Sequence, residues 1–135
     1  MKRFTAVLTI LIISVGAHAA AKDEPSNQGF GFATVNDTLA FLKAKPSVSF
    51  TTTKPDGWLI ANDSKPFSIW SFTPEGHYAY PAVVKRELKQ NAQGGVFIEM
   101  TALCEATKDA CDRLIGEFQK LNGQTKEDVQ KRLKD

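Results

Sequence analysis

Residues 96–118, VFIEMTALCEATKDACDRLIGEF, contain the strand-to-helix boundary that organises the predicted fold. From Val96 to Cys104 the residues alternate with a period of two, so alternate apolar side chains share one face of a strand. Thr107 is then a suitable helix N-cap, and apolar residues recur at helical spacing from Ala110 to Leu121. A bond between Cys104 and Cys111 would therefore hold the helix against the apolar face of that strand.

The sequence holds two cysteines, Cys104 and Cys111. In an exported protein, a disulfide is the default state of such a pair. Closing this small ring would contribute ~2.5 kcal/mol by the loop-entropy estimate. A reduced, catalytic Cys104 is the alternative, but the spacing is not a CxxC motif and gives redox chemistry little support.

The first residues, MKRFTAVLTILIISVGAHAA, predict a secretory signal peptide over residues 1–19. Two basic residues precede a short apolar run, and Ala17-His18-Ala19 is a cleavage pattern. The run is shorter than the ~20 residues of a membrane-spanning helix, so we expect no membrane anchor after cleavage and a periplasmic or secreted protein. The net charge of +2 falls to zero when Lys2 and Arg3 are removed. A protein without net positive charge gives no electrostatic indication of nucleic-acid binding.

The remaining chain predicts one small domain of the α+β class. Helical periodicity favours a helix at about residues 35–44, and short runs at 48–52, 58–62, 67–73, 80–89 and 96–104 are typical of strands separated by turns. We expect a five-stranded antiparallel meander with the N-terminal helix and the disulfide-held C-terminal helix packed on one face.

The domain boundaries follow from composition. Residues 20–33 are polar and glycine-rich and predict a flexible lead-in. The α+β domain is expected over 34–123, because Asn122-Gly123 is a helix-ending signal. Residues 124–135 predict a short C-terminal helix or tail.

The stretch at 68–86, SIWSFTPEGHYAYPAVVKR, is rich in aromatic residues and contains the single histidine expected in the mature chain. Cross-strand packing that stabilises a hairpin is one interpretation. An exposed patch that binds a partner is the other, because tyrosine and tryptophan are favoured at such contacts. The candidate binding residues are Trp70, Phe72, His77, Tyr78, Tyr80 and Arg86.

Arg86 has the phase of the presumed core face, which is unusual for a charged residue. Its head group either reaches solvent along the sheet or forms an anion site beneath the helix. No metal-ligand cluster, GxSxG nucleophile motif or phosphate-binding glycine loop is present, so the sequence predicts no metal, no cofactor and no catalytic residues.

The motifs WSFTPEGHYAYPAVVKR and LCEATKDACDRLIGEF resemble those of small exported proteobacterial proteins of uncharacterised function. The similarity covers about residues 46 to 122. It implies a periplasmic location and a paired cysteine motif, and it implies no activity.

These patterns favour a non-catalytic binding or accessory protein that acts on another envelope protein, as an inhibitor, a chaperone or similar. Two alternatives stay open. One is a small hydrolase or acid–base enzyme that uses His77 and Arg86, which requires these groups to come within hydrogen-bond reach. The other is a small-ligand carrier with a hydrophobic cavity between helix and sheet.

Overall fold

The computed structural model describes residues 30–65 and 67–134. The predicted signal peptide and residues 20–29 of the predicted lead-in lie outside this part. In chain order the elements are α1 (Val35–Lys43), β1 (Val48–Thr52), β2 (Leu59–Ser64), β3 (Phe67–Phe72), β4 (Ala82–Gln90), β5 (Val96–Cys104) and α2 (Lys108–Arg132).

The five strands form one antiparallel sheet in the order β1-β2-β3-β4-β5, so each strand pairs with its neighbours in sequence. The β4–β5 hairpin is the longest pairing and runs from Ala82 opposite Cys104 to Gln90 opposite Val96. At its turn, Gly94 has φ +81°, a conformation that side chains disfavour. The predicted five-stranded meander, its two flanking helices and its disulfide are confirmed.

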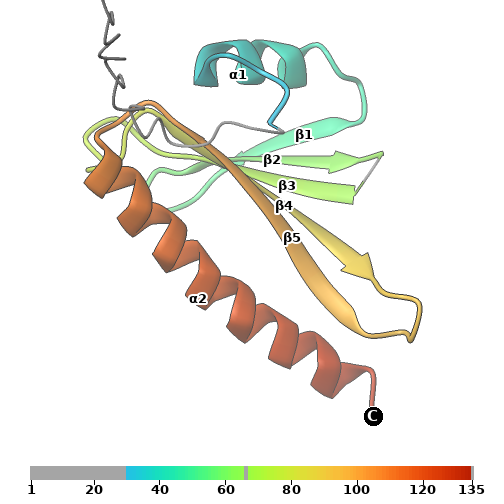
Figure 1. Cartoon of the computed structure of the whole chain (residues 1–135). Coiled ribbons are helices and arrows are strands. Elements are labelled where there is room, and N and C mark those ends of the chain that lie inside the picture. Colours follow the sequence, from blue (N-terminus) through green and yellow to red (C-terminus); the bar gives the residue numbers. More distant parts are fainter. Residues whose placement is uncertain (1–29, 66, 135) are drawn as a thin grey trace, which may run out of the picture.

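The two helices cover opposite faces of the sheet, as Figure 1 shows. The expectation that both pack on one face is therefore wrong. The reason lies in β4, where Val83 packs with the α1 side and its neighbour Val84 packs with the α2 side. Because successive residues of a strand point to opposite faces, an apolar run of this kind can be buried only by a layer on each side. The molecule thus has three layers rather than two.

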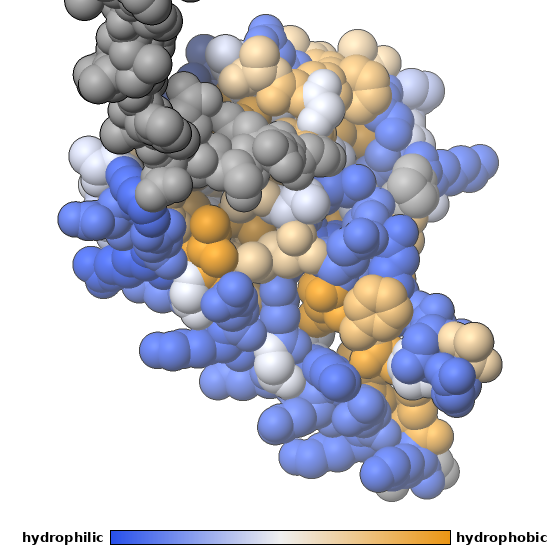
Figure 2. All heavy atoms as spheres, viewed as in Figure 1, coloured by the Kyte–Doolittle hydropathy of each residue, from blue (hydrophilic) through white to orange (hydrophobic). Residues whose placement is uncertain are grey.

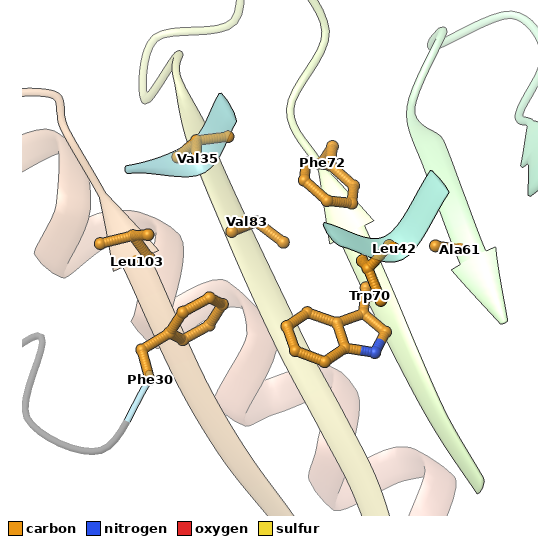
Figure 3. Packing of buried hydrophobic residues seen from close by; sticks show 8 residues of the cluster. All are labelled: Phe30, Val35, Leu42, Ala61, Trp70, Phe72, Val83 and Leu103. Carbon is orange, nitrogen blue, oxygen red and sulfur yellow. The ribbon is translucent and has the colours of Figure 1, made fainter. Parts of the chain in front are cut away.

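The layer between α1 and the sheet contains the larger aromatic side chains (Figure 3). Phe30 is only 6% exposed and meets the Trp70 ring edge-on, with 5.5 Å between centroids. The folded unit therefore includes Phe30, which the sequence assigned to the flexible lead-in. The buried members of this cluster are Phe30, Val35, Leu42, Ala61, Trp70, Phe72, Val83 and Leu103.

The layer between α2 and the sheet is built around the disulfide. Cys104 at the end of β5 is bonded to Cys111 in the first turns of α2, with 5.8 Å between their Cα atoms. The Thr107 side chain accepts a hydrogen bond from the Ala110 N–H and caps the helix, as the sequence predicts. Leu114 and Phe118 continue the buried stripe along α2.

Helix α2 does not end at Asn122-Gly123 but continues to Arg132. Within the segment predicted as a separate short helix or tail, Thr125 donates its hydroxyl to the Leu121 carbonyl at 2.9 Å, which is a bond within a continuous helix. Gly123 is exposed, and glycine in a helix interior costs only ~1 kcal/mol relative to alanine.

Neither helix in the described part of the chain has the length and apolar character that a bilayer crossing would require.

The buried carboxylate of Asp63 in β2 binds residues of the loop after α1. Asp63 is 2% exposed, accepts hydrogen bonds from the Ser47 hydroxyl at 2.7 Å and the Lys65 N–H at 3.0 Å, and forms an ion pair with Lys45. Burial raises the pKa of this carboxyl, but the hydrogen bonds from Lys45, Ser47 and Lys65 together outweigh burial and hold the pKa below its ordinary value.

We expect replacement of both cysteines by alanine to lower the free energy of unfolding by ~2.5 kcal/mol, because the ring no longer restricts the unfolded chain. Urea unfolding of the double variant measures the loss, and reduced wild-type protein should give a similar value. A difference below about 0.5 kcal/mol, the range of neutral surface changes, would show that apolar packing alone holds α2.

We expect Asp63→Asn to destabilise the protein by about 2 kcal/mol at pH 7. Because the folded-state pKa of Asp63 lies below the unfolded value of about 3.9, the contribution of the carboxylate is fully present above that pH. It is lost as the pH falls through the folded-state pKa, so the gap between wild type and variant should shrink below about pH 4. Urea unfolding between pH 7 and 3 tests this, with the exposed Asp128→Asn as control. A gap that widens in acid would contradict it.

Candidate functional site

Two of the six candidate binding residues lie in the interior. Trp70 is 5% and Phe72 4% exposed, and both pack in the cluster beneath α1. The Trp70 indole donates a hydrogen bond to the Ser68 hydroxyl at 3.0 Å, and the Lys85 amine lies 5.1 Å from the ring centroid. The folded protein therefore offers neither residue as a contact surface, because both belong to the core beneath α1.

The turn after β3 carries the other aromatic candidates and faces α2. The Tyr78 hydroxyl donates a hydrogen bond to Glu117 at 2.7 Å, and Glu117 also accepts one from the Arg113 Nε at 3.0 Å. The Arg113 guanidinium lies over the Tyr78 ring, 4.2 Å from its centroid. Tyr80 is 45% exposed. The turn is thus fixed to the helix by polar contacts at its outer edge.

His77 joins this turn to the interior of the α2 layer. Its Nδ1 accepts a hydrogen bond from the Ala79 N–H at 3.1 Å, and its ring stacks on Tyr78 with 4.3 Å between centroids. Burial lowers the pKa of His77, the negative charge of Glu117 raises it, and the positive charge of Arg113 lowers it, with a net decrease. The imidazole is therefore mainly neutral at pH 7.

A row of rings connects His77 with Arg86. Trp58 lies 5.0 Å from the His77 ring and 5.8 Å from the Phe118 ring, both edge-on. The Arg86 guanidinium in turn lies 5.3 Å from the Phe118 centroid. The structure therefore places His77, Tyr78 and Arg86 on the same side of the sheet, with Trp58 and Phe118 between them.

Arg86 is half-buried on the α2 side of β4, between Ile69 of β3 and Met100 of β5. Its Nε is buried and has no hydrogen-bond partner within the described residues. Burial lowers the pKa of the guanidinium, which nevertheless stays charged at any physiological pH.

Two concavities meet at Arg86. The first, the Trp58 pocket, has a volume of about 320 Å³ and is lined by Thr53, Asp56, Trp58, Ile60, Ser71, Arg86, Glu117, Phe118 and Leu121. The second, the Phe67 pocket, has a volume of about 220 Å³ and is lined by Phe67, Ile69, Arg86, Glu87, Leu88, Ile98, Thr125 and Val129. Figure 2 shows patches of apolar surface beside the hydrophilic side of α2.

Sequence reasoning missed Trp58, Phe118 and Leu121 as site residues. Phe118 and Leu121 belong to the apolar stripe of α2, whose spacing predicts core residues, and Trp58 begins the predicted strand at 58–62. The sequence signal that could have identified this site is Arg86. A charged residue in the phase of a core face needs a polar environment for its own head group.

No cluster of three or more His, Cys, Asp or Glu residues within 30–65 and 67–134 is arranged to hold a metal ion. The two cysteines are bonded to each other and are not nucleophiles. The arrangement around Arg86 is instead that of a binding site, with an apolar lining and few polar groups.

We expect the His77 imidazole to titrate below pH 6.5, because burial disfavours its charged form. Glu117→Gln removes a negative charge and should lower the pKa further, whereas Arg113→Gln removes a positive charge and should raise it. Both variants break the same Arg113–Glu117 ion pair, so each is the matched control of the other. Proton NMR titration, with His77→Gln to assign the signal, measures the three values. Shifts in the same direction for both variants would contradict this account.

Comparison with known proteins provides no relative for this chain: no family model, no curated protein and no solved structure matches it. The resemblance to small exported proteobacterial proteins stays a prediction, and the site's chemistry is argued from its own residues.

Proposed function

We propose that this protein is an exported, non-catalytic binding protein that holds a small, largely apolar molecule in the Trp58 pocket between α2 and the sheet. The observation that carries the proposal is the pocket itself. Its volume of about 320 Å³ lies at the lower end of the range for small-molecule sites, ~300–1,000 Å³.

The lining supports a ligand with an apolar body. Trp58, Ile60, Phe118 and Leu121 supply most of the wall, and removing a ligand's apolar surface from water there would stabilise the complex by roughly 25 cal/mol per Å². The pocket is open to solvent at its α2 side, where Leu121 is exposed, so a ligand can reach the apolar wall from the surface. This feature favours the small-ligand carrier among the alternatives that the sequence left open.

The acid–base enzyme receives less support. Among the described residues, no hydrogen bond joins His77 to Arg86 or to a carboxylate, and His77 Nδ1 is engaged by the backbone of Ala79. The arrangement that a general base requires is therefore not assembled around His77.

Binding to another envelope protein stays a prediction. The surface that could serve it is smaller than the sequence suggested, because Trp70 and Phe72 are buried and α2 covers part of the second sheet face. Tyr78 and Tyr80, at 38% and 45% exposure, are the aromatic candidates that remain at the surface.

Titration with the neutral fluorescent probe N-phenyl-1-naphthylamine tests the pocket. We expect saturable, one-to-one binding, with a rise in probe fluorescence and a change in tryptophan emission from Trp58. Leu121→Ser removes apolar wall from the pocket and should weaken binding about tenfold.

Leu133→Ser is the matched control, because Leu133, the C-cap of α2, is also an exposed leucine, at 69%, and lines neither pocket. It should leave the affinity unchanged. Circular dichroism melting verifies that both variants fold. The absence of saturable binding by wild-type protein, or an equal affinity of the two variants, would refute the proposed site.

A further inference from the structure

Arg86 is a half-buried charge without a counter-charge in the described part of the chain. It forms no ion pair there, its buried Nε has no hydrogen-bond partner, and its guanidinium lies 5.3 Å from the Phe118 ring centroid. Partial burial of an uncompensated charge is unfavourable, and a contact with an aromatic face offsets only part of that cost. No ion pair within the described residues therefore accounts for the position of this cation.

Two of the three carboxylates in the pocket linings form ion pairs with other cations. Glu117 is bonded to Arg113 and Tyr78. Glu87 forms ion pairs with Lys85 and Lys89 on the other side of β4. The remaining acid is Asp56, an exposed residue at the mouth of the Trp58 pocket.

A second buried polar atom without a partner lies close to the same place. The Asn122 amide nitrogen contacts the Met100 sulfur at 3.3 Å, and its Oδ1 is buried without a hydrogen bond. Met100 is the cross-strand partner of Arg86. Unsatisfied buried polar groups are rare in folded proteins, and Asn122 lines neither pocket, whereas Arg86, with its unpaired Nε, lines both and marks the place for a polar occupant.

We propose that the ligand is an amphiphilic monocarboxylate whose head group binds Arg86 and whose apolar body occupies the Trp58 pocket. The inference rests on the proposed function and specifies its ligand class. The guanidinium presents its donors in a planar fork that matches a carboxylate.

The single charge of Arg86 decides between anionic head groups. A carboxylate carries one negative charge and is neutralised by one guanidinium. A phosphate monoester carries about 1.5 to 2 negative charges at pH 7 and would leave excess charge in an apolar site. Arg86 also borders the Phe67 pocket, so a branch of the ligand can extend to the other side of the head group.

The experiment compares ligands of one chain length at pH 7.5, by displacement of N-phenyl-1-naphthylamine and by calorimetry. We expect decanoate to bind wild-type protein about 10- to 100-fold more tightly than decanol, because hydrogen bonds to a charged group distinguish the two heads. Decyl phosphate should bind more weakly than decanoate.

Arg86→Met keeps the length of the side chain and removes its charge. The variant should lose the preference for decanoate and bind decanol as before. Its melting temperature without ligand should be equal to or above that of wild type, because an apolar side chain relieves the buried charge. Arg86→Lys should recover only part of the preference, and Arg132→Met, at the exposed end of α2, should behave as wild type.

The outcomes separate the two proposals. If decanoate and decanol bind equally and Arg86→Met changes neither, the carboxylate inference is wrong and the apolar pocket stands. Tighter binding of decyl phosphate than of decanoate also overturns the inference. If Arg86→Met unfolds the protein, Arg86 has a structural role and the inference fails. If neither the probe nor any ligand binds, both proposals fail.

Discussion

The Cys104–Cys111 disulfide is the constraint on which the α2 side of the molecule depends. It fixes the start of α2 at the end of β5, and from that point the helix crosses the sheet face in a direction set by Leu114 and Phe118. The space left between the helix and strands β2 and β3 becomes the Trp58 pocket. If the helix began elsewhere, Phe118 would not meet Trp58, and Arg86 would lie either in solvent or in a filled core.

Much of the fold was predictable because its signals are local. Alternation marked the strands, Thr107 marked the start of α2, and each cysteine lay on the apolar side of its own element. The side of the sheet that α1 covers was not predictable in this way. A strand with apolar residues on both faces, as at Val83 and Val84 of β4, indicates that both faces of the sheet are covered. It does not indicate which helix covers which face.

The site was predictable only in part, because its residues meet through tertiary structure. Arg86 could be identified alone, since its charge conflicts with the phase of its strand. Its neighbours could not, because Trp58 and Phe118 are 60 positions apart in sequence and read individually as ordinary apolar residues. Trp70 and Phe72 were misleading for the complementary reason: an aromatic residue has the same local pattern whether its strand face is exposed or covered by a helix.

Burial is uneven along α2, and Gly123 separates a first half with buried residues from a second half without them. Its buried residues, Cys111, Leu114 and Phe118, all lie before Gly123, and the turns after it contact the sheet only through partly exposed side chains. The first half is therefore a rigid wall, whereas the second half is held by few contacts and opens at low free-energy cost. The α2 residues of the Trp58 pocket belong to the rigid half, whereas Thr125 and Val129 of the compliant half line the Phe67 pocket. The width of the Phe67 pocket is therefore expected to adapt to its occupant more readily than the width of the Trp58 pocket.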